Sequence, residues 1–313
     1  MRIVDFNTCH IEQAERIAKQ NYDEECGHIP VLPSVVKLPC LKDFADSNRG
    51  VALIEEDRLL GFLCWLAPVE NLFGTEKGAW SPVHAHGAVV QNRTEIYDRL
   101  YQAAGGRLTA EGVLCHSVTL YEHDTDANLS FAHNGFGKRC VDAIRATDTF
   151  VSSDSTGIVF RQAGNDDAGI LTEMRNNLGQ HLSGSPMFMP FARSYDTADT
   201  EEEIISGKYY YFLAYKSGQP VAYYRIQKTA ETFISYDPSM MNISGAFAIP
   251  EVRGKGISSA FLSWLMDWLR NHGYSLCGVD FECFNYTARK FWLKYFTAYT
   301  NSVVRRIDER IRL

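Results

Sequence analysis

An internal repeat is the feature that most constrains how this chain folds. Each half opens with a short β-rich run that leads into apolar residues at helical spacing, at residues 3–18 and 158–178. Each half then shows a hairpin, at residues 51–63 and 209–226. The two copies lie about 155–160 residues apart, which is the length of one domain.

The order of the elements predicts the fold class. Strands and helices alternate unevenly in each half, which favours an α/β (α+β) fold with a mixed central sheet flanked by helices. Because the 313 residues hold two copies of one unit, we expect one domain at residues 1–146 and another at residues 157–313. Residues 147–156, rich in Ser, Thr and Asp, are the expected linker.

Charge and apolar content exclude several classes of protein. The chain has 31 Lys and Arg against 38 Asp and Glu, a net charge of −7, so it lacks the basic surface of a nucleic-acid scaffold. The most apolar stretch, residues 59–69, is too short to span a bilayer, and the start shows no signal peptide. Eight cysteines without a CxxC pair indicate free thiols in a reducing compartment. We therefore expect a soluble, cytoplasmic protein that binds neither nucleic acid nor membrane.

The most informative segment is residues 245–274. Gly245–Ile249 is a strand by composition, and Pro250 ends its hydrogen-bond ladder. An amphipathic helix with apolar residues from Ala260 to Leu269 follows, and Gly273 is suitably placed to end it.

The loop between this strand and helix favours an anion. Its residues are Arg253-Gly254-Lys255-Gly256-Ile257-Ser258. The two glycines let backbone N–H groups turn toward one point, and the helix N-terminus adds unpaired N–H groups and a partial positive charge. Two basic side chains and a serine hydroxyl complete a pattern typical of a pyrophosphate cradle. On spacing alone, an ordinary glycine-rich turn with solvated basic residues is an equal alternative.

This strand–loop–helix resembles motif A of the GNAT superfamily of acyl-CoA-dependent N-acyltransferases, R/Q-x-x-G-x-G/A. Arg253 takes the first position and Gly256 the fourth, and Ser258 replaces the usual final Gly or Ala. Downstream, residues 279–284 resemble the fifth strand of the superfamily. The helix start N-x-x-A-x-x-F is matched by Asn285, Ala288 and Phe291. With the repeat, and with the Gly-Phe pair at 135–136, the whole chain resembles a tandem GNAT protein.

The resemblance implies that acetyl-CoA binds to the C-terminal domain as co-substrate, without a metal. Its diphosphate would bind the loop residues 253–258, and Asn285 would contact the pantetheine arm or phosphates or, alternatively, only cap its helix. Backbone N–H groups of Phe247, Ala248 and Ile249, on a splayed fourth strand, would stabilise the oxyanion.

Acid–base chemistry needs two further groups. To accept the proton of a lysine-like amine, whose ordinary pKa is about 10.4, we favour Glu282, with Asp280 second. Both lie on one face of a strand, and neighbouring carboxylates can have their proton affinities pushed apart. The alternatives are that the pair caps the next helix or binds the cation of the acceptor. Trp292 stands where many relatives carry the tyrosine that supplies a proton, so Tyr295, Tyr299 and water remain open as the acid.

The first half lacks the loop. Residues 93–98 align with it but contain no glycine, and Glu95 and Asp98 would repel a diphosphate. We therefore expect a degenerate GNAT-like domain that does not bind acyl-CoA. His84 and His86 alternate on an expected strand and could share a zinc ion. Because no third ligand is identified, partly exposed strand histidines are the favoured interpretation.

The leading hypothesis is a tandem GNAT enzyme that moves acetyl from acetyl-CoA to a small-molecule amine in a ternary complex, as a monomer or homodimer. An acyl-CoA-binding regulatory or interaction module without turnover is the alternative, which stays open because position 292 holds a tryptophan and not a tyrosine. A structural protein that retains only the fold is a weaker third.

Overall fold

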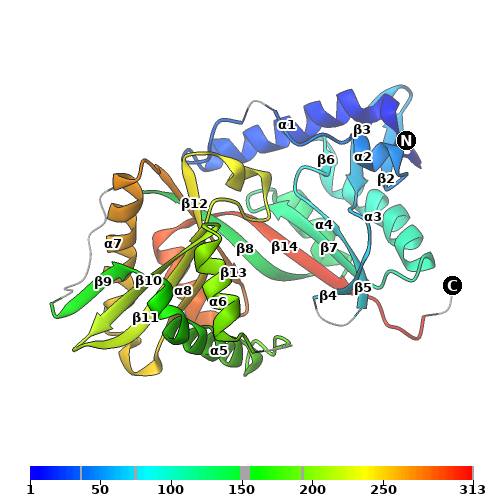
Figure 1. Ribbon diagram of the computed structural model, residues 1–313. Coiled ribbons are helices and arrows are strands. Elements are labelled where there is room, and N and C mark those ends of the chain that lie inside the picture. Colours follow the sequence, from blue (N-terminus) through cyan, green and yellow to red (C-terminus); the bar gives the residue numbers. More distant parts are fainter. Residues whose placement is uncertain (36, 74–75, 149–155, 192–193, 312–313) are drawn as a thin grey trace. The chain divides into compact units, whose positions relative to one another are not determined.

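The computed structural model describes residues 1–35, 37–73, 76–148, 156–191 and 194–311 (Figure 1). The chain divides into two compact units, Met1–Asp142 with Thr297–Leu313, and Ala143–Phe296. Most of the expected linker, residues 149–155, lies outside the described residues. Thr147 is buried in unit 2, where its N–H donates to the carbonyl oxygen of Ser275 at 2.9 Å.

The described residues of unit 1 form two groups of strands and four α-helices. A four-stranded sheet has the order β1-β2-β3-β6, and a second group runs β4-β5-β7-β14 and on to β8. The strands are β1 (Arg2–Asp5), β2 (Gly50–Glu55), β3 (Arg58–Cys64), β4 (Val69–Leu72), β5 (Glu76–Ser81), β6 (His86–Ala88), β7 (Cys115–Tyr121), β8 (Gly137–Ala146) and β14 (Thr297–Arg306). The helices are α1 (Ile11–His28), α2 (Lys42–Asp46), α3 (Arg93–Ala110) and α4 (Thr125–His133).

Unit 2 contains one mixed sheet with helices on both faces. Its strands follow the order β9-β10-β11-β12-β13, antiparallel except for the parallel β12–β13 pair. They are β9 (Ile158–Gln162), β10 (Tyr209–Lys216), β11 (Gln219–Gln227), β12 (Met240–Ala248) and β13 (Leu276–Glu282). The helices are α5 (Ala168–Ser183), α6 (Thr197–Ile205), α7 (Ile257–Asn271) and α8 (Tyr286–Tyr295).

Alternation along the strands decides which helix covers which face of this sheet. Phe212 packs against Trp264 and Trp268 of α7, with ring centroids 5.6 and 4.9 Å away. Its neighbour Leu213 points to the opposite face, where it joins a core with Met174 of α5. Apolar residues on two faces therefore hold α7 and α5 on opposite sides of one sheet (Figure 1).

The repeat predicted from the sequence is confirmed by the elements. Helix α1 begins 157 residues before α5, β7 161 before β13, and α3 164 before α7. The sequence did not predict the distribution of the last strands. β14 pairs with β7 inside unit 1, from Thr300↔Tyr121 to Arg306↔Cys115, and the last four residues of β8 belong to unit 2. The second copy therefore contributes its final strand, β14, to unit 1, whereas the final strand of the first copy, β8, begins in unit 1 and ends in unit 2.

Candidate functional site

Strands β12 and β13 separate partway along their length. Their parallel pairing runs from Met240↔Leu276 to Ile243↔Val279, whereas β12 continues to Ala248. Over this extension β12 is paired only with β11, up to Ala222↔Ala248. The edge of β12 that faces β13 is therefore open from Ser244 onward.

The ladder decides which backbone groups face that opening. The N–H of Ile249 donates to the carbonyl oxygen of Val221 on the β11 side at 3.0 Å. Because antiparallel ladders alternate, the N–H of Phe247 also turns toward β11, and the backbone groups of Ala246 and Ala248 turn toward the opening. Arg253 agrees, since its Nε donates to the carbonyl oxygen of Ala248 at 2.9 Å. Of the three N–H groups expected to stabilise an oxyanion, only that of Ala248 faces the open edge.

The chain after β12 makes the compact turn that the sequence predicted. Pro250–Val252 form a single 3-10 turn, and α7 begins at Ile257. Gly254 and Gly256 have φ angles of +73° and +82°, a region in which residues with a side chain are strained. The first helical hydrogen bond, from Ala260 N–H to Gly256 oxygen, leaves the N–H groups of Ile257 and Ser258 ahead of the helical ladder.

A cavity of about 710 Å³ lies over this turn and the open strand edge. It extends past the strand edge to both faces of the sheet, because Leu178 and His181 of α5 line it together with α7 and α8. Seven of the residues predicted to bind the cofactor line the cavity: Phe247, Ala248, Arg253, Gly254, Gly256, Ser258 and Asn285. The other three, Ile249, Lys255 and Ile257, do not line it. Lys255 is exposed to solvent, and Ile257 is buried in the core.

The cavity is electropositive. Arg253, Lys290 and Lys294 line it, and no Asp or Glu is among its lining residues within the described chain. Desolvation, followed by the charge of Arg253, lowers the pKa of His181, so this imidazole adds a neutral donor and acceptor near pH 7. Three cations and a helix N-terminus around one cavity favour an anionic ligand.

Asn285 both caps α8 and lines the cavity. Its Oδ1 accepts hydrogen bonds from the N–H of Ala288 at 3.2 Å and from the Thr287 hydroxyl at 2.9 Å. The capping function expected as an alternative is therefore present, and the buried side chain also reaches the cavity.

Aromatic side chains form the inner wall. Tyr224 stacks on Phe261 of α7 at 4.5 Å, lies 6.1 Å from Trp292, and donates its hydroxyl to Ser258 oxygen at 3.1 Å. Burial raises the pKa of Tyr224, so its proton is held. Tyr295 follows Trp292 by three residues on the same face of α8 and lines the cavity while half-buried.

Three neighbouring carboxylates, those of Asp280, Glu282 and Glu231, lie near the end of β13, and none of them lines the cavity. Asp280 and Glu282 alternate with the buried Phe281, so they share one strand face as predicted. Desolvation by the surrounding protein, reinforced by Glu231 and Glu282, raises the pKa of Asp280 to about 6, although its side chain keeps contact with solvent. A carboxyl with this pKa exchanges its proton close to neutral pH.

Residues 180–296 match the family model described as Acetyltransferase (GNAT) family. This segment is a GNAT domain. It lies in unit 2 and runs from the end of α5 through α8, so it contains the loop, the open strand edge and most of the cavity wall. No curated protein matches the chain in sequence.

Two solved structures with TM-scores above 0.5 share the fold. A GCN5-related N-acetyltransferase from Sphaerobacter thermophilus is 12% identical to this chain and superposes with a TM-score of 0.59. The match covers 100% of this chain and 97% of that protein. The GCN5-related glucosamine N-acetyltransferase region of a fungal multi-domain β-N-acetylglucosaminidase is 11% identical and has a TM-score of 0.53. The match covers 97% of this chain and 38% of that protein. A tandem GNAT protein from the clavulanic acid biosynthesis pathway is 15% identical, covers 100% and 99%, and has a TM-score of 0.47.

Sequence reasoning missed three basic lining residues of the GNAT domain: His181, Lys290 and Lys294. The two lysines carried a detectable signal, because they follow the helix start at Asn285 by five and nine residues and are four residues apart. His181 carried none, because it enters the cavity from α5, on the far side of the sheet.

The equivalent helix start in unit 1 is closed by an arginine. Asn92 precedes α3 with φ +56°, as Gly256 precedes α7. The two helices therefore align 164 residues apart, so the predicted alignment of residues 93–98 with residues 253–258 is wrong, and Glu95 and Asp98 lie inside α3, beyond this turn. The buried Arg93 that follows pairs with Glu24 at 2.8 Å and Asp124 at 3.2 Å. A cation held by two carboxylates occupies this turn. That the first half does not bind acyl-CoA stays a prediction.

The histidine pair does not alternate on a strand as the sequence analysis assumed. His84 lies in a turn that Pro82 begins, and only His86 belongs to β6. Both ring nitrogens of buried His86 are engaged, with the Tyr97 hydroxyl at 3.0 Å and the Thr119 carbonyl at 2.7 Å. Burial lowers the pKa of His86 to about 4. Across the described residues, no group of three or more potential ligands is placed to hold a metal ion, and no helix is long and apolar enough to cross a membrane.

Proposed function

We propose that the GNAT domain transfers an acetyl, or another short acyl group, from acetyl-CoA to the amine of a small molecule. The observation that carries this proposal is the cavity at the start of α7. It combines two glycines at positive φ, a helix N-terminus and three cations with a strand edge left open by its neighbour.

The residues present suit acyl-CoA. Space around Gly254 is open to 4 Å, so a phosphate can approach the backbone there. Gly254, Gly256 and the first N–H groups of α7 would hold the diphosphate, together with the guanidinium of Arg253, which lines the same cavity. Lys290, Lys294 and Asn285 would hold the remaining phosphate and the pantetheine arm. When bound, acetyl-CoA supplies an activated acyl thioester.

The open edge of β12 supplies donors to the reacting carbonyl. The N–H of Ala248, and that of Ala246 two residues earlier, face this edge. A backbone N–H fixed by an adjacent ladder needs no reorganisation when negative charge develops on the thioester oxygen. Ala248 therefore replaces the broader set of Phe247, Ala248 and Ile249 in our proposal.

A carboxylate at the end of β13 accepts the proton that the amine loses as it attacks. Glu282 and Asp280 share a face there, and the raised pKa of Asp280, about 6, brings proton transfer close to neutral pH. The negative pair also attracts the ammonium form of the acceptor before it loses a proton.

Tyr295 is the group we assign to protonate the leaving sulfur. Trp292 has no acidic proton to give, and the hydroxyl of Tyr224 donates to Ser258. Tyr295 lines the same cavity one helical turn beyond Trp292. The assignment predicts that Tyr295→Phe lowers kcat with little change in the KM for acetyl-CoA, and that Tyr295→Trp behaves in the same way.

The remaining parts of the proposal concern surroundings. Since acidic residues outnumber basic ones over the chain, we infer a small-molecule acceptor and not a nucleic acid or an anionic membrane. We infer action in the cytoplasm, as a monomer or homodimer, with the first domain playing no part in acyl-CoA binding.

The experiment is a thiol-release assay with acetyl-CoA and a panel of small amines, using the full chain. We expect release with at least one amine, and a loss of about 100-fold or more in kcat for Glu282→Gln or Asp280→Asn. Glu251→Gln, an exposed carboxylate change in the same unit, is the matched control and should keep full turnover. Acetyl-CoA binding without release would favour the non-catalytic module, and no binding at all would refute the proposal.

A further inference from the structure

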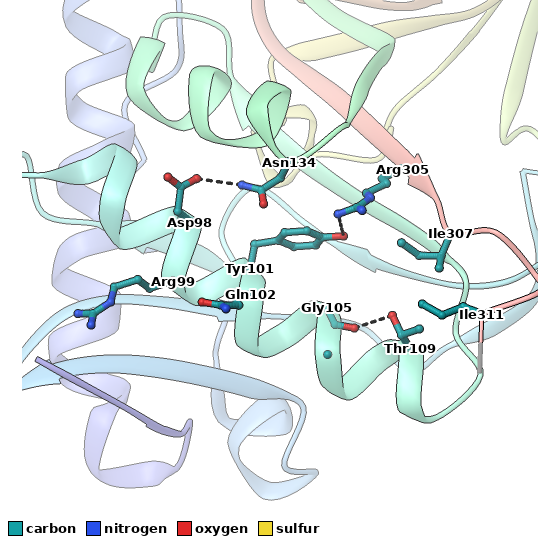
Figure 2. A pocket seen from close by; sticks show the side chains of 11 residues that line it. Asp98, Arg99, Tyr101, Gln102, Gly105, Thr109, Asn134, Arg305, Ile307 and Ile311 are labelled. Atoms are coloured by element: carbon teal, nitrogen blue, oxygen red, sulfur yellow. Dashed lines mark hydrogen bonds between the residues drawn. The ribbon is translucent and has the colours of Figure 1, made fainter. Parts of the chain in front are cut away.

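Unit 1 holds a separate cavity of about 540 Å³ (Figure 2). It lies along the middle and end of α3, beside the end of α4 and the strand end of β14. The cavity of about 710 Å³ in the GNAT domain, called the GNAT cavity from here on, lies instead at the first turns of α7. The lining of the unit 1 cavity includes Asp98, Tyr101, Gly106, Arg305, Ile307 and Ile311.

A chain of hydrogen bonds fixes the chemistry of one wall. His116 Nε2 lies 2.9 Å from the carbonyl oxygen of Val113, which can only accept, so Nε2 carries the proton. Nδ1 of His116 must then accept, and Tyr101 donates its hydroxyl to it at 2.9 Å. Burial, together with the nearby charge of Arg305, lowers the pKa of His116 and keeps this tautomer neutral. The oxygen of Tyr101 is left to accept from Arg305 Nη1, a long contact of 3.4 Å.

Arg305 therefore donates one N–H to a neutral hydroxyl. A guanidinium has five N–H donors, and within the described chain no carboxylate lies at ion-pair distance from Arg305. Asp98, the acidic residue of the lining, faces Asn134 and Ser130 instead, at 2.9 and 2.6 Å. Figure 2 shows Arg305 bonded to the hydroxyl of Tyr101 and, separately, Asp98 bonded to Asn134.

The repeat supplies a comparison for this arginine. Arg145 stands 160 residues before Arg305, at the matching position of β8. Its guanidinium donates to the carbonyl oxygens of Ala146 and Tyr295 and pairs with Asp148 at 3.2 Å. The same position is thus saturated by protein in unit 2, whereas in unit 1 it faces a cavity.

Two glycines of α3, Gly105 and Gly106, leave the facing wall of the cavity without side chains at these positions. Gly105 and Gly106 lie in the interior of the 18-residue helix α3, where glycine is less stable than alanine. A Cβ on Gly106 would meet nothing within 4 Å, so helix packing does not require this glycine. The opposite wall is apolar, formed by Ile307 and Ile311.

We propose that this cavity binds a small carboxylic acid with an apolar body. Its carboxylate pairs with Arg305, and its body lies between the glycine surface of α3 and the side chains of Ile307 and Ile311. A bidentate carboxylate–guanidinium pair matches the N–H groups that Tyr101 leaves over. This site is independent of the acetyl-CoA site and of the proposed transferase reaction.

Benzoate is the probe, with benzamide as its uncharged counterpart, measured on the full chain by saturation-transfer NMR. We expect benzoate to bind at millimolar concentration or below, and benzamide about tenfold or more weaker, because the charge-assisted pair is lost. Arg305→Gln should weaken benzoate by about tenfold or more. Arg306→Gln removes the same charge from the next residue of β14, which pairs with Glu76, and should leave benzoate binding unchanged.

Two further variants separate this cavity from other causes. Gly106→Phe places a ring in open space on α3 and should abolish benzoate binding while the fold is kept. Arg253→Gln removes a cation from the GNAT cavity and should have no effect. The proposal is overturned if benzoate does not bind, if benzamide binds as well, if Arg305→Gln or Gly106→Phe binds normally, or if Arg253→Gln abolishes binding.

Discussion

Replacing Asp280 with asparagine is expected to stabilise the protein at neutral pH. In the folded chain the surrounding protein and two neighbouring carboxylates oppose ionisation of Asp280, and its pKa of about 6 stands above the ordinary value of 3.8. Above pH 6 the side chain is ionised whether the chain is folded or unfolded, so the folded state alone carries the cost of that charge. Asparagine removes the charge and with it the cost.

The size of the effect follows from the shift. A rise from 3.8 to about 6 corresponds to about 3 kcal/mol if none of it is screened. Because the side chain of Asp280 is exposed, solvent screens much of the interaction, and we expect about 1 kcal/mol. As pH falls from 6 toward 3.8 the folded wild type takes up its proton first, so the advantage of Asp280→Asn shrinks and disappears near pH 4.

Urea unfolding at two pH values tests this account. Near pH 7.5, Asp280→Asn should raise the unfolding midpoint by a few tenths molar, and near pH 4 the two midpoints should coincide. Glu251→Gln removes an exposed carboxylate from the same unit and controls for a general effect of charge removal. Equal or lower stability of Asp280→Asn near pH 7.5 would refute the reasoning.

Three further substitutions test local parts of the structure. Asn285→Ala removes the cap of α8 and should cost about 1 kcal/mol in thermal unfolding, while Asn285→Asp keeps most of the stability; equal stability of Asn285→Ala would contradict the cap. Gly106→Ala should stabilise unit 1 by about 0.5–1 kcal/mol, and a loss in urea unfolding would show that the helix needs this glycine. Phe131→Ala removes a fully buried ring of unit 1 and should cost about 3–5 kcal/mol; less than about 1 kcal/mol would contradict its place in the core.

Much of unit 2 could be predicted because its signals are local. A β-rich run, Pro250, two glycines and an amphipathic run predicted the strand, turn and helix that the structure shows. The predicted side-chain alternation of Asp280 and Glu282 also holds, since it depends only on a regular strand. The cap at Asn285 follows from its side chain and its position before a helix.

Other features depend on contacts between distant residues and left no local signal. The placement of β14 beside β7 depends on which edge of a sheet is open, and nothing in residues 297–306 encodes that. The availability of Ala248 rather than Ile249 depends on the register between β11 and β12. His84 failed as a strand residue because Pro82 starts a turn there, a signal that was present but outweighed by the alternation of two histidines.

Calorimetric titration of acetyl-CoA into the full chain and two glycine variants tests the central claim most directly. Gly256 and Gly218 both have positive φ, +82° and +77°, but only Gly256 lines the GNAT cavity. Glutamate at either position brings similar backbone strain, so the difference between the variants isolates the cavity. We predict that Gly256→Glu weakens acetyl-CoA by about tenfold or more and that Gly218→Glu does not. Unchanged affinity in Gly256→Glu, or equal loss in both variants, would contradict the account.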